Sequence, residues 1–332
     1  MKISKDTDSL LTWEKITRFN RREHMKNINV VNGPQNVSVI VQGCMRMPDL
    51  TKEAAAKVIR TAYDCGINFF DHATCYGAGA AEERFAEAFP LTGIKREDIY
   101  IQSKCGLCFD RNEFDWTKEN ILSSVDGILS RLNVEYLDAL LLHRPDVLFD
   151  PEEVAEAFDI LEKEGKVRHF GVSNLVPMQI ELLKKYAKQH LVFNQVQLSL
   201  EQSQLIDQAL YMNNKTTEFS VNRDGNALDY CRLNDITIQA WSPLQFGMFG
   251  GTFIDNPKFP ELNEALAKFA EREGVSKSAI AIAWILRHPA KMQAIIGTMN
   301  PDHIKDICAA TNVNLSHHDW YELYLAAGKF LP

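Results

Sequence analysis

Short apolar runs alternate with amphipathic segments over most of the chain. The runs are rich in aliphatic and β-branched residues, which is typical of buried strands, whereas apolar residues between them recur at i, i+3 and i+4, as in helices. The pattern predicts eight strands, at residues 37–43, 67–73, 98–104, 136–143, 167–174, 191–197, 235–242 and 292–298. It predicts a helix after each strand, at residues 51–65, 80–89, 117–132, 151–164, 177–189, 225–233, 276–288 and 301–310. Eight such units predict an α/β protein with a (β/α)8 TIM barrel rather than an open doubly wound sheet.

Some segments fall outside the eight units. Residues 1–24 are charged and are interpreted as an N-terminal extension that is disordered or precedes an alternative start, which leaves residues 25–332 as a single barrel domain. Residues 261–273 and 317–327 predict additional helices. Residues 199–224 form a polar connection longer than an ordinary barrel loop, and on the carboxyl face of the barrel they would form a lid over a pocket.

Composition narrows the class of function. The formal net charge is −8, from 36 basic and 44 acidic residues, so the chain has no basic field for nucleic acid or an anionic membrane. No apolar run approaches the roughly 20 residues of a membrane span, and the N-terminus lacks the apolar region of a secretory signal. These features predict a cytoplasmic protein that acts on small molecules; its oligomeric state stays open.

The seven cysteines are scattered without the spacing of a disulfide framework and are interpreted as reduced thiols. Cys105 and Cys108 form a C-x-x-C, but no second ligand pair accompanies it, and no metal site is predicted. Cys75 and Cys105 each neighbour a candidate catalytic residue, which raises the hypothesis that their oxidation switches activity.

The stretch "NFFDHATCYGAGAAEERF", residues 68–85, runs from a strand through two glycines into a helix. A Rossmann phosphate loop would have glycines directly after the first strand and a third glycine where Glu82 stands. Here the glycines follow the second strand after a gap of six residues, and Glu82 would repel a phosphate. The better interpretation is a loop that carries catalytic side chains.

Four polar residues stand at or just after three consecutive strand ends: Asp71, Tyr76, Lys104 and His143. In a TIM barrel such positions carry the chemistry, and we expect the interior layers below them to be aliphatic. An ammonium beside a phenol lowers the phenol's pKa, so Lys104 is expected to make Tyr76 a usable acid. Asp71 would hold Lys104, and His143 would hydrogen-bond a substrate carbonyl oxygen. Each residue alone also has a structural explanation; their coincidence favours one pocket.

Seven stretches in order resemble the aldo-keto reductase family, over residues from about 28 to the C-terminus: "GINFFDHATCYG", "IQSKCG", "LLLHRPD", "GKVRHFGVSN", "FNQVQ", "AWSPLQFG" and "IIGT". The chain looks most similar to the bacterial branch with "HRPD" after the fourth strand. The resemblance implies a barrel that binds NADPH without a Rossmann fold, with Tyr76 as proton donor and Asp71, Lys104 and His143 as its partners. It also implies a cofactor site formed by Ser173, Asn174, Gln195, Trp241, Ser242, Pro243, Leu244, Gly297, Thr298 and His303.

The resemblance assigns parts to these residues. Ser173, Asn174 and Gln195 would hold the nicotinamide amide, Trp241 would stack on its ring, and backbone amides around Ser242 would meet the pyrophosphate. Many relatives carry basic residues after the eighth strand for the adenosine 2′-phosphate. Here Lys305 is the one firm charge in that segment and His303 stands where arginine is common, so NADPH is expected first and NADH use is possible.

Loops after the strands are expected to form the substrate pocket, with Met45, Arg46, Met47, Arg144, Pro145 and residues 199–224 and 246–259 as walls. Methionine and phenylalanine favour an apolar pocket, and Arg46 is a candidate contact for an acidic group. The resulting hypothesis is an NADPH-dependent reductase of an aldehyde or ketone. The alternative is a nicotinamide-nucleotide-binding sensor or interaction subunit with little turnover, and a more distant one is an unrelated barrel lyase or isomerase.

Overall fold

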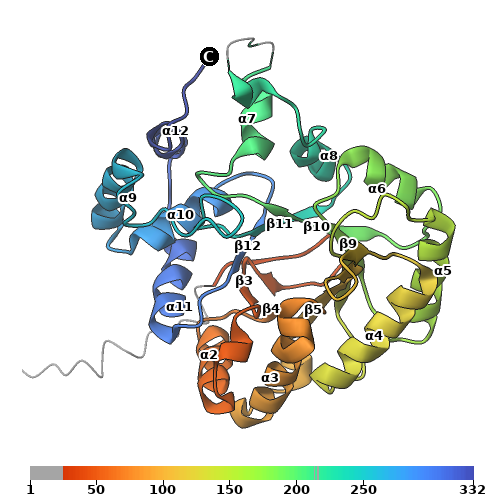
Figure 1. Cartoon of the computed structure of the whole chain (residues 1–332). Helices are drawn as coiled ribbons and strands as arrows, with labels where there is room; N and C mark the ends of the chain where they lie inside the picture. The colour runs from red at the N-terminus through yellow and green to blue at the C-terminus, as the bar shows by residue number, and fades with distance from the viewer. Residues whose placement is uncertain (1–24, 213, 215–216) are drawn as a thin grey trace, which may run out of the picture.

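The computed structural model describes residues 25–212, 214 and 217–332, and its centre is a closed barrel of eight parallel strands (Figure 1). The predicted fold class is confirmed, while the N-terminal extension lies outside the described residues. Each barrel strand pairs with the next barrel strand along the chain, and the last of them, β12, pairs with the first, β3. The strands are β3 (Ile40–Gly43), β4 (Phe69–Asp71), β5 (Tyr100–Cys105), β8 (Ala139–Leu142), β9 (Phe170–Ser173), β10 (Leu191–Gln197), β11 (Thr237–Trp241) and β12 (Gln293–Ile296).

Helices surround this barrel in chain order (Figure 1). They are α2 (Lys52–Asp64), α3 (Ala80–Ala88), α4 (Lys118–Leu132), α5 (Pro151–Lys163), α6 (Pro177–Lys184), α7 (Gln204–Leu210), α8 (Ala227–Leu233), α9 (Pro260–Glu273), α10 (Lys277–Leu286), α11 (Pro301–Cys308) and α12 (His317–Ala326). Side chains cap several of them: Thr117 accepts from Asn120 N and Asp150 from Glu152 N. Among the described helices, none combines the length and apolar character that a membrane span requires.

The predicted first strand, 37–43, is two strands in the structure. Val37–Ser38 forms β2, which pairs antiparallel with β1 (Asn27–Ile28), and the barrel strand β3 begins only at Ile40. Apolar side chains of this hairpin and its turn pack against inward-facing side chains of the barrel strands and form one cluster with them. The buried members of this cluster are Val30, Val37, Val41, Phe69, Ala139, Leu141, Val192, Phe193 and Ile295. The hairpin therefore closes the amino end of the barrel, and the carboxyl end is left to carry the site.

Candidate active site

The structure brings Asp71, Tyr76, Lys104 and His143 together at the carboxyl ends of β4, β5 and β8. Lys104 Nζ lies 2.7 Å from each carboxylate oxygen of Asp71, 2.7 Å from His72 O and 3.2 Å from the Tyr76 hydroxyl. Lys104 and Asp71 are almost completely buried. The ammonium is thus fixed between a carboxylate and a phenol, as an acid relay requires.

Burial affects the pKa values of Tyr76 and Lys104 more strongly than the sequence indicated. Burial raises the pKa of Tyr76 to about 12, and the lowering by nearby Lys104 only partly offsets it. Burial opposes the charge of Lys104, but Asp71 and Tyr76 together outweigh it through charge and hydrogen bonding, and the pKa of Lys104 is raised. The expected net lowering of the Tyr76 pKa is therefore wrong. Tyr76 keeps its proton at neutral pH, which is the state a proton donor needs.

His143 follows β8, and its ring lies edge-on to the Tyr76 ring, with centroids 6.0 Å apart. Burial, together with the positive charges of Lys104 and Arg144, holds the pKa of His143 well below its ordinary value. Its Nδ1 lies 3.5 Å from Cys75 Sγ. His143 is thus a neutral imidazole beside the phenol, able to hydrogen-bond a carbonyl oxygen without competing for the proton of Tyr76.

The two cysteines beside the site are not activated thiols. Burial raises the pKa of Cys75 to about 11, although Lys104 lowers it in part, and burial raises that of Cys105 to about 12. Oxidation needs thiolate character, which these pKa values remove at neutral pH. The structure therefore gives no support to the oxidation switch.

The interior layer directly beneath the site is polar, which corrects the expectation of aliphatic layers at this level, while the layer below it is the apolar cluster at the amino end. Gln102 and Gln195 donate to Asp71 Oδ1, at 2.6 and 3.0 Å. Both also donate to Gln239 Oε1, whose own amide donates to Gln293 Oε1 at 2.9 Å. The buried glutamines that form this layer are Gln102, Gln195, Gln239 and Gln293. Two amides and an ammonium therefore fix the Asp71 carboxylate, and the network anchors it to strands on the far side of the barrel.

His72 offers a test of how burial in this region links stability to pH. It is completely buried, its ring nitrogens have no hydrogen-bond partner among the described residues, and burial lowers its pKa to about 3. The unfolded chain binds a proton here near pH 6.5 and the folded chain does not, so this residue removes stability as pH falls from 6.5 towards 3. We expect the wild type to lose about 2 to 3 kcal/mol more than His72→Leu between pH 7 and 4.5 in urea unfolding.

The matched control for this experiment is His317→Leu, because His317 is exposed on α12. The stability of His317→Leu should change with pH in the same way as that of the wild type. Equal pH dependence of His72→Leu and wild type would contradict the assignment of a buried neutral imidazole.

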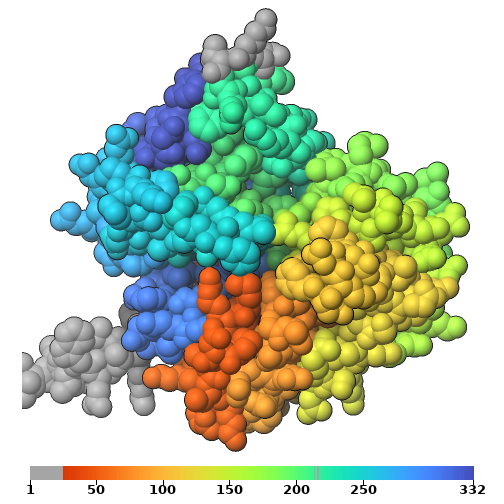
Figure 2. All heavy atoms as spheres, viewed as in Figure 1, coloured from red at the N-terminus to blue at the C-terminus, as the bar shows by residue number. Residues whose placement is uncertain are grey.

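A cavity of about 1360 Å³ opens above these side chains. Asp71, Tyr76 and His143 line it, and so do all the residues expected to bind the cofactor: Ser173, Asn174, Gln195, Trp241, Ser242, Pro243, Leu244, Gly297, Thr298 and His303. In the space-filling view the cyan atoms of the loop after β11 lie across the viewed face, opposite the amber region of the segment after β5 (Figure 2). The cavity thus joins the predicted catalytic and cofactor residues in one space.

The residues expected to bind nicotinamide form a hydrogen-bonded row. Trp241 Nε1 donates to Asn174 Oδ1 at 3.1 Å, Asn174 Nδ2 donates to Ser173 Oγ at 2.7 Å, and Ser173 Oγ donates to Gln195 O at 2.8 Å. The Gln195 amide nitrogen donates to Asp71, so this residue also links the row to the Asp71 carboxylate. An aromatic face beside amide and hydroxyl groups suits a planar carboxamide ring.

The far end of the cavity lies at the starts of α10 and α11. Ser276, Lys277, Ser278, His303 and Asp306 line it. Lys277 pairs with Asp255. Lys305 pairs with Asp302 at 2.9 Å, so its charge is already balanced. Sequence reasoning missed Lys277 because it lies in a different unit from the segment after β12. Among the described residues, this end of the cavity carries little free positive charge for a phosphate group.

The walls of the cavity differ in part from those expected. Met45, Arg46, Arg144, Met248 and Phe249 line it as predicted from the sequence. Met47 is instead buried in the core, Pro145 does not line the cavity, and neither does any described residue of 199–224. Sequence reasoning missed the hairpin of β6 (Leu107–Cys108) and β7 (Glu113–Phe114), which adds Leu107, Phe109 and Phe114 to the wall. Two-residue strands leave almost no periodic signal.

Described residues of the segment 199–224 pack against the loop that follows β11. Ser199 Oγ donates to Gln245 O at 2.8 Å, and Gln202 Nε2 donates to Phe246 O at 3.0 Å, so this segment holds the loop after β11. Within it, α7 faces α12, where Tyr324 donates to Asp207 Oδ1 at 2.7 Å. The lid prediction is therefore wrong for the described residues.

Gly79, in the loop between β4 and α3, serves the packing of a buried ion pair. Glu82 is fully buried and binds Arg131 Nε and Ser103 Oγ, each at 2.7 Å. Gly79 adopts φ 96°, and a Cβ there would come within 2.7 Å of the Arg131 side chain. The loop therefore accommodates the arginine that neutralises Glu82 and leaves no phosphate cradle.

Comparison with known proteins places this geometry in a family. The model of the aldo/keto reductase family matches residues 39–324. The chain belongs to the aldo/keto reductase family. This aldo/keto reductase is 33% identical, over 88% of its length, to a 6-dehydroglucose reductase of Agrobacterium fabrum, and covers 95% of that protein. It is 32% identical to the uncharacterized oxidoreductase YcsN of Bacillus subtilis, over 87% of this chain and 94% of that one.

Solved structures agree with the barrel of this aldo/keto reductase. A thermostable aldo-keto reductase crystallised with the inhibitor epalrestat matches with a TM-score of 0.72 at 23% identity, over 91% of this chain and 99% of that one. At this identity the likeness shows the fold alone. Family membership makes the chain an oxidoreductase consistent with NAD(P)H-dependent carbonyl reduction.

Proposed function

We propose that this chain reduces an aldehyde or ketone to an alcohol with NADPH, and that Tyr76 is the proton donor. The observation that carries the proposal is the contact of the buried Lys104 ammonium with both the Asp71 carboxylate and the Tyr76 hydroxyl beneath a large cavity. A structural salt bridge would need no phenol facing a cavity. A raised tyrosine pKa together with a neutral histidine is the combination expected for an acid and a hydrogen-bonding partner.

When bound, the nicotinamide cofactor supplies the hydride. Ser173 and Asn174 would hold its amide, Trp241 would meet its ring and the Ser242–Leu244 segment its pyrophosphate. His143 would hold the substrate oxygen near the Tyr76 hydroxyl. As negative charge develops on that oxygen, Tyr76 gives it a proton, and Lys104 stabilises the phenolate that remains. Asp71 and the two glutamines that bind it keep Lys104 in place.

The family resemblance favours NADPH as the first choice, and the scarcity of free positive charge at the far end of the cavity keeps NADH as a second. His303 and Lys277 line the far end of the cavity, but Lys277 is already paired with Asp255. A relative 26% identical to this chain is named an NADH-specific methylglyoxal reductase of Escherichia coli, so both nucleotides deserve measurement.

Replacing His303 tests this part of the site. We expect His303→Arg to raise the affinity for NADPH over NADH by about tenfold, because a guanidinium binds a phosphate through two charge-assisted hydrogen bonds. Fluorescence titration with each nucleotide measures the ratio without turnover. The matched control is His317→Arg, the same change on exposed α12. An unchanged ratio of NADPH to NADH affinity in His303→Arg would mean that the 2′-phosphate binds away from residue 303.

Absorbance at 340 nm tests the activity itself, with NADPH and then NADH against aliphatic, aromatic and dicarbonyl compounds. Steady loss of absorbance with a carbonyl substrate is the expected result. Tight nucleotide binding with no turnover of any carbonyl would favour the sensor or interaction subunit instead.

A further inference from the structure

The cavity wall contains an arginine, Arg144, that no carboxylate among the described residues neutralises. Arg144 follows His143, is half-buried and lines the cavity. Three carboxylates also line this space, Asp71, Asp255 and Asp306, but none lies within ion-pair distance of Arg144 in the described part of the chain. Asp71 is committed to Lys104 and Asp255 to Lys277.

Other partly buried arginines of this chain are neutralised. Arg84 pairs with Glu87, Arg96 with Asp138 and Arg131 with Glu82. Arg144 instead points a guanidinium nitrogen at Met248 Sδ, 3.8 Å away, and its guanidinium carbon lies 5.4 Å from the centre of the Trp241 ring. A thioether and an aromatic face compensate a charge only weakly, and burial lowers the pKa of Arg144.

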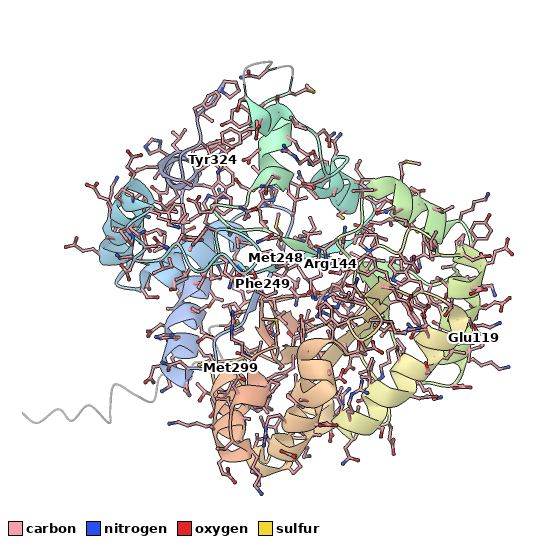
Figure 3. All side chains as sticks on the ribbon, viewed as in Figure 1. Glu119, Arg144, Met248, Phe249, Met299 and Tyr324 are labelled. Atoms are coloured by element: carbon pink, nitrogen blue, oxygen red, sulfur yellow. The ribbon has the colours of Figure 1, made fainter. Side chains whose placement is uncertain are left out.

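The rim of the same cavity is apolar. Figure 3 shows Arg144, Met248 and Phe249 close together over the opening of the barrel. Large apolar side chains that line this cavity are exposed: Met45, Phe109, Phe114, Met248 and Phe249. Such an exposed patch around a cavity is typical of a ligand site, here for an aromatic or otherwise apolar body.

We propose that Arg144 binds a carboxylate of the substrate, so that the enzyme selects carbonyl compounds that carry a carboxylate on an apolar, preferably aromatic, body. This deepens the proposed function and rests on it. A planar guanidinium matches a carboxylate through two parallel hydrogen bonds, and the position next to His143 places that group near the reacting carbonyl. Arg46, the sequence-based candidate, is exposed and donates to Gly297 O at 3.0 Å, on the side of the expected cofactor residues.

The test compares 2-, 3- and 4-carboxybenzaldehyde with their methyl esters, which remove the charge and keep the aromatic aldehyde. For the isomer whose carboxylate reaches Arg144, the wild type should prefer the acid in kcat/KM by tenfold or more. Arg144→Met should lower kcat/KM for that acid by about 10- to 100-fold and change that for the ester less than threefold. Arg144→Lys should lie between, because it keeps the charge but loses the paired donors.

The matched control is Arg232→Met, the same substitution in an exposed pair with Asp229 on α8, which should keep the wild-type preference. Equal use of acid and ester for all three isomers, or a preference that survives in Arg144→Met, would overturn the inference while leaving the reductase intact. If neither acids nor esters turn over, the proposed function has failed. Titration of benzoate by tryptophan fluorescence then decides on Arg144 alone: binding lost in Arg144→Met supports it, and binding kept in that variant overturns it.

Discussion

Tyr76→Phe should lower kcat for carbonyl reduction by about 10²- to 10⁴-fold, the usual contribution of a positioned acid, with little change in NADPH affinity. Phenylalanine keeps the ring that meets His143 edge-on and that Lys104 overlies at 4.9 Å, so the change removes only the hydroxyl. Turnover at 340 nm and fluorescence titration of the nucleotide measure the two effects separately.

The matched control is Tyr100→Phe. Tyr100 lies at the start of β5, at the opposite end of the barrel, where its hydroxyl donates to Gln35 O at 2.6 Å. We expect that variant to keep wild-type turnover. If Tyr76→Phe retained more than about a tenth of wild-type kcat, another group would have to donate the proton, and the assignment of Tyr76 would be withdrawn.

Lys104→Met should destabilise the fold as well as stop the reaction. Removing the ammonium leaves the Asp71 carboxylate buried with only amide donors, and breaking a buried ion pair on one side costs about 3 to 5 kcal/mol. The loss of the cation beside Tyr76 should also lower kcat by at least about 10²-fold, because the phenolate is no longer stabilised. Urea unfolding and turnover at 340 nm measure the two.

The double variant Lys104→Met/Asp71→Asn separates these effects. An asparagine removes the unpaired charge, so the double variant should regain at least half of the lost stability and remain inactive. It also gives a folded protein for assay if the single variant fails to fold. Loss of stability in the double variant equal to the sum of the two single losses would contradict a direct ion pair, since independent sites are additive.

The barrel and the catalytic group could be predicted because their signals are local. Each strand is an apolar run, and Asp71, Lys104 and His143 interrupt or end such runs, so parallel strands bring them to one edge. The motifs that resemble the family then gave the candidate cofactor residues, which line the same cavity.

The predictions that failed concern features that depend on packing between residues far apart in the sequence. The polar composition of residues 199–224 indicates a surface segment but not which side of the barrel it covers. The glutamine layer was visible as one polar residue inside several apolar runs, such as Gln102 and Gln239, yet only the closed barrel shows that these side chains meet. The Tyr76 pKa depends on burial, which spacing does not reveal.

The most direct test of the account is isotope transfer from NADPH deuterated at the transferable C4 position to a carbonyl compound that the enzyme turns over. Mass spectrometry and proton NMR of the product read the result. Direct hydride transfer predicts one deuterium on the carbinol carbon, and none in Tyr76→Phe beyond its residual turnover. An alcohol product without deuterium, with either hydrogen at C4 labelled in turn, would contradict direct hydride transfer, and no alcohol despite bound nucleotide would contradict the reductase itself.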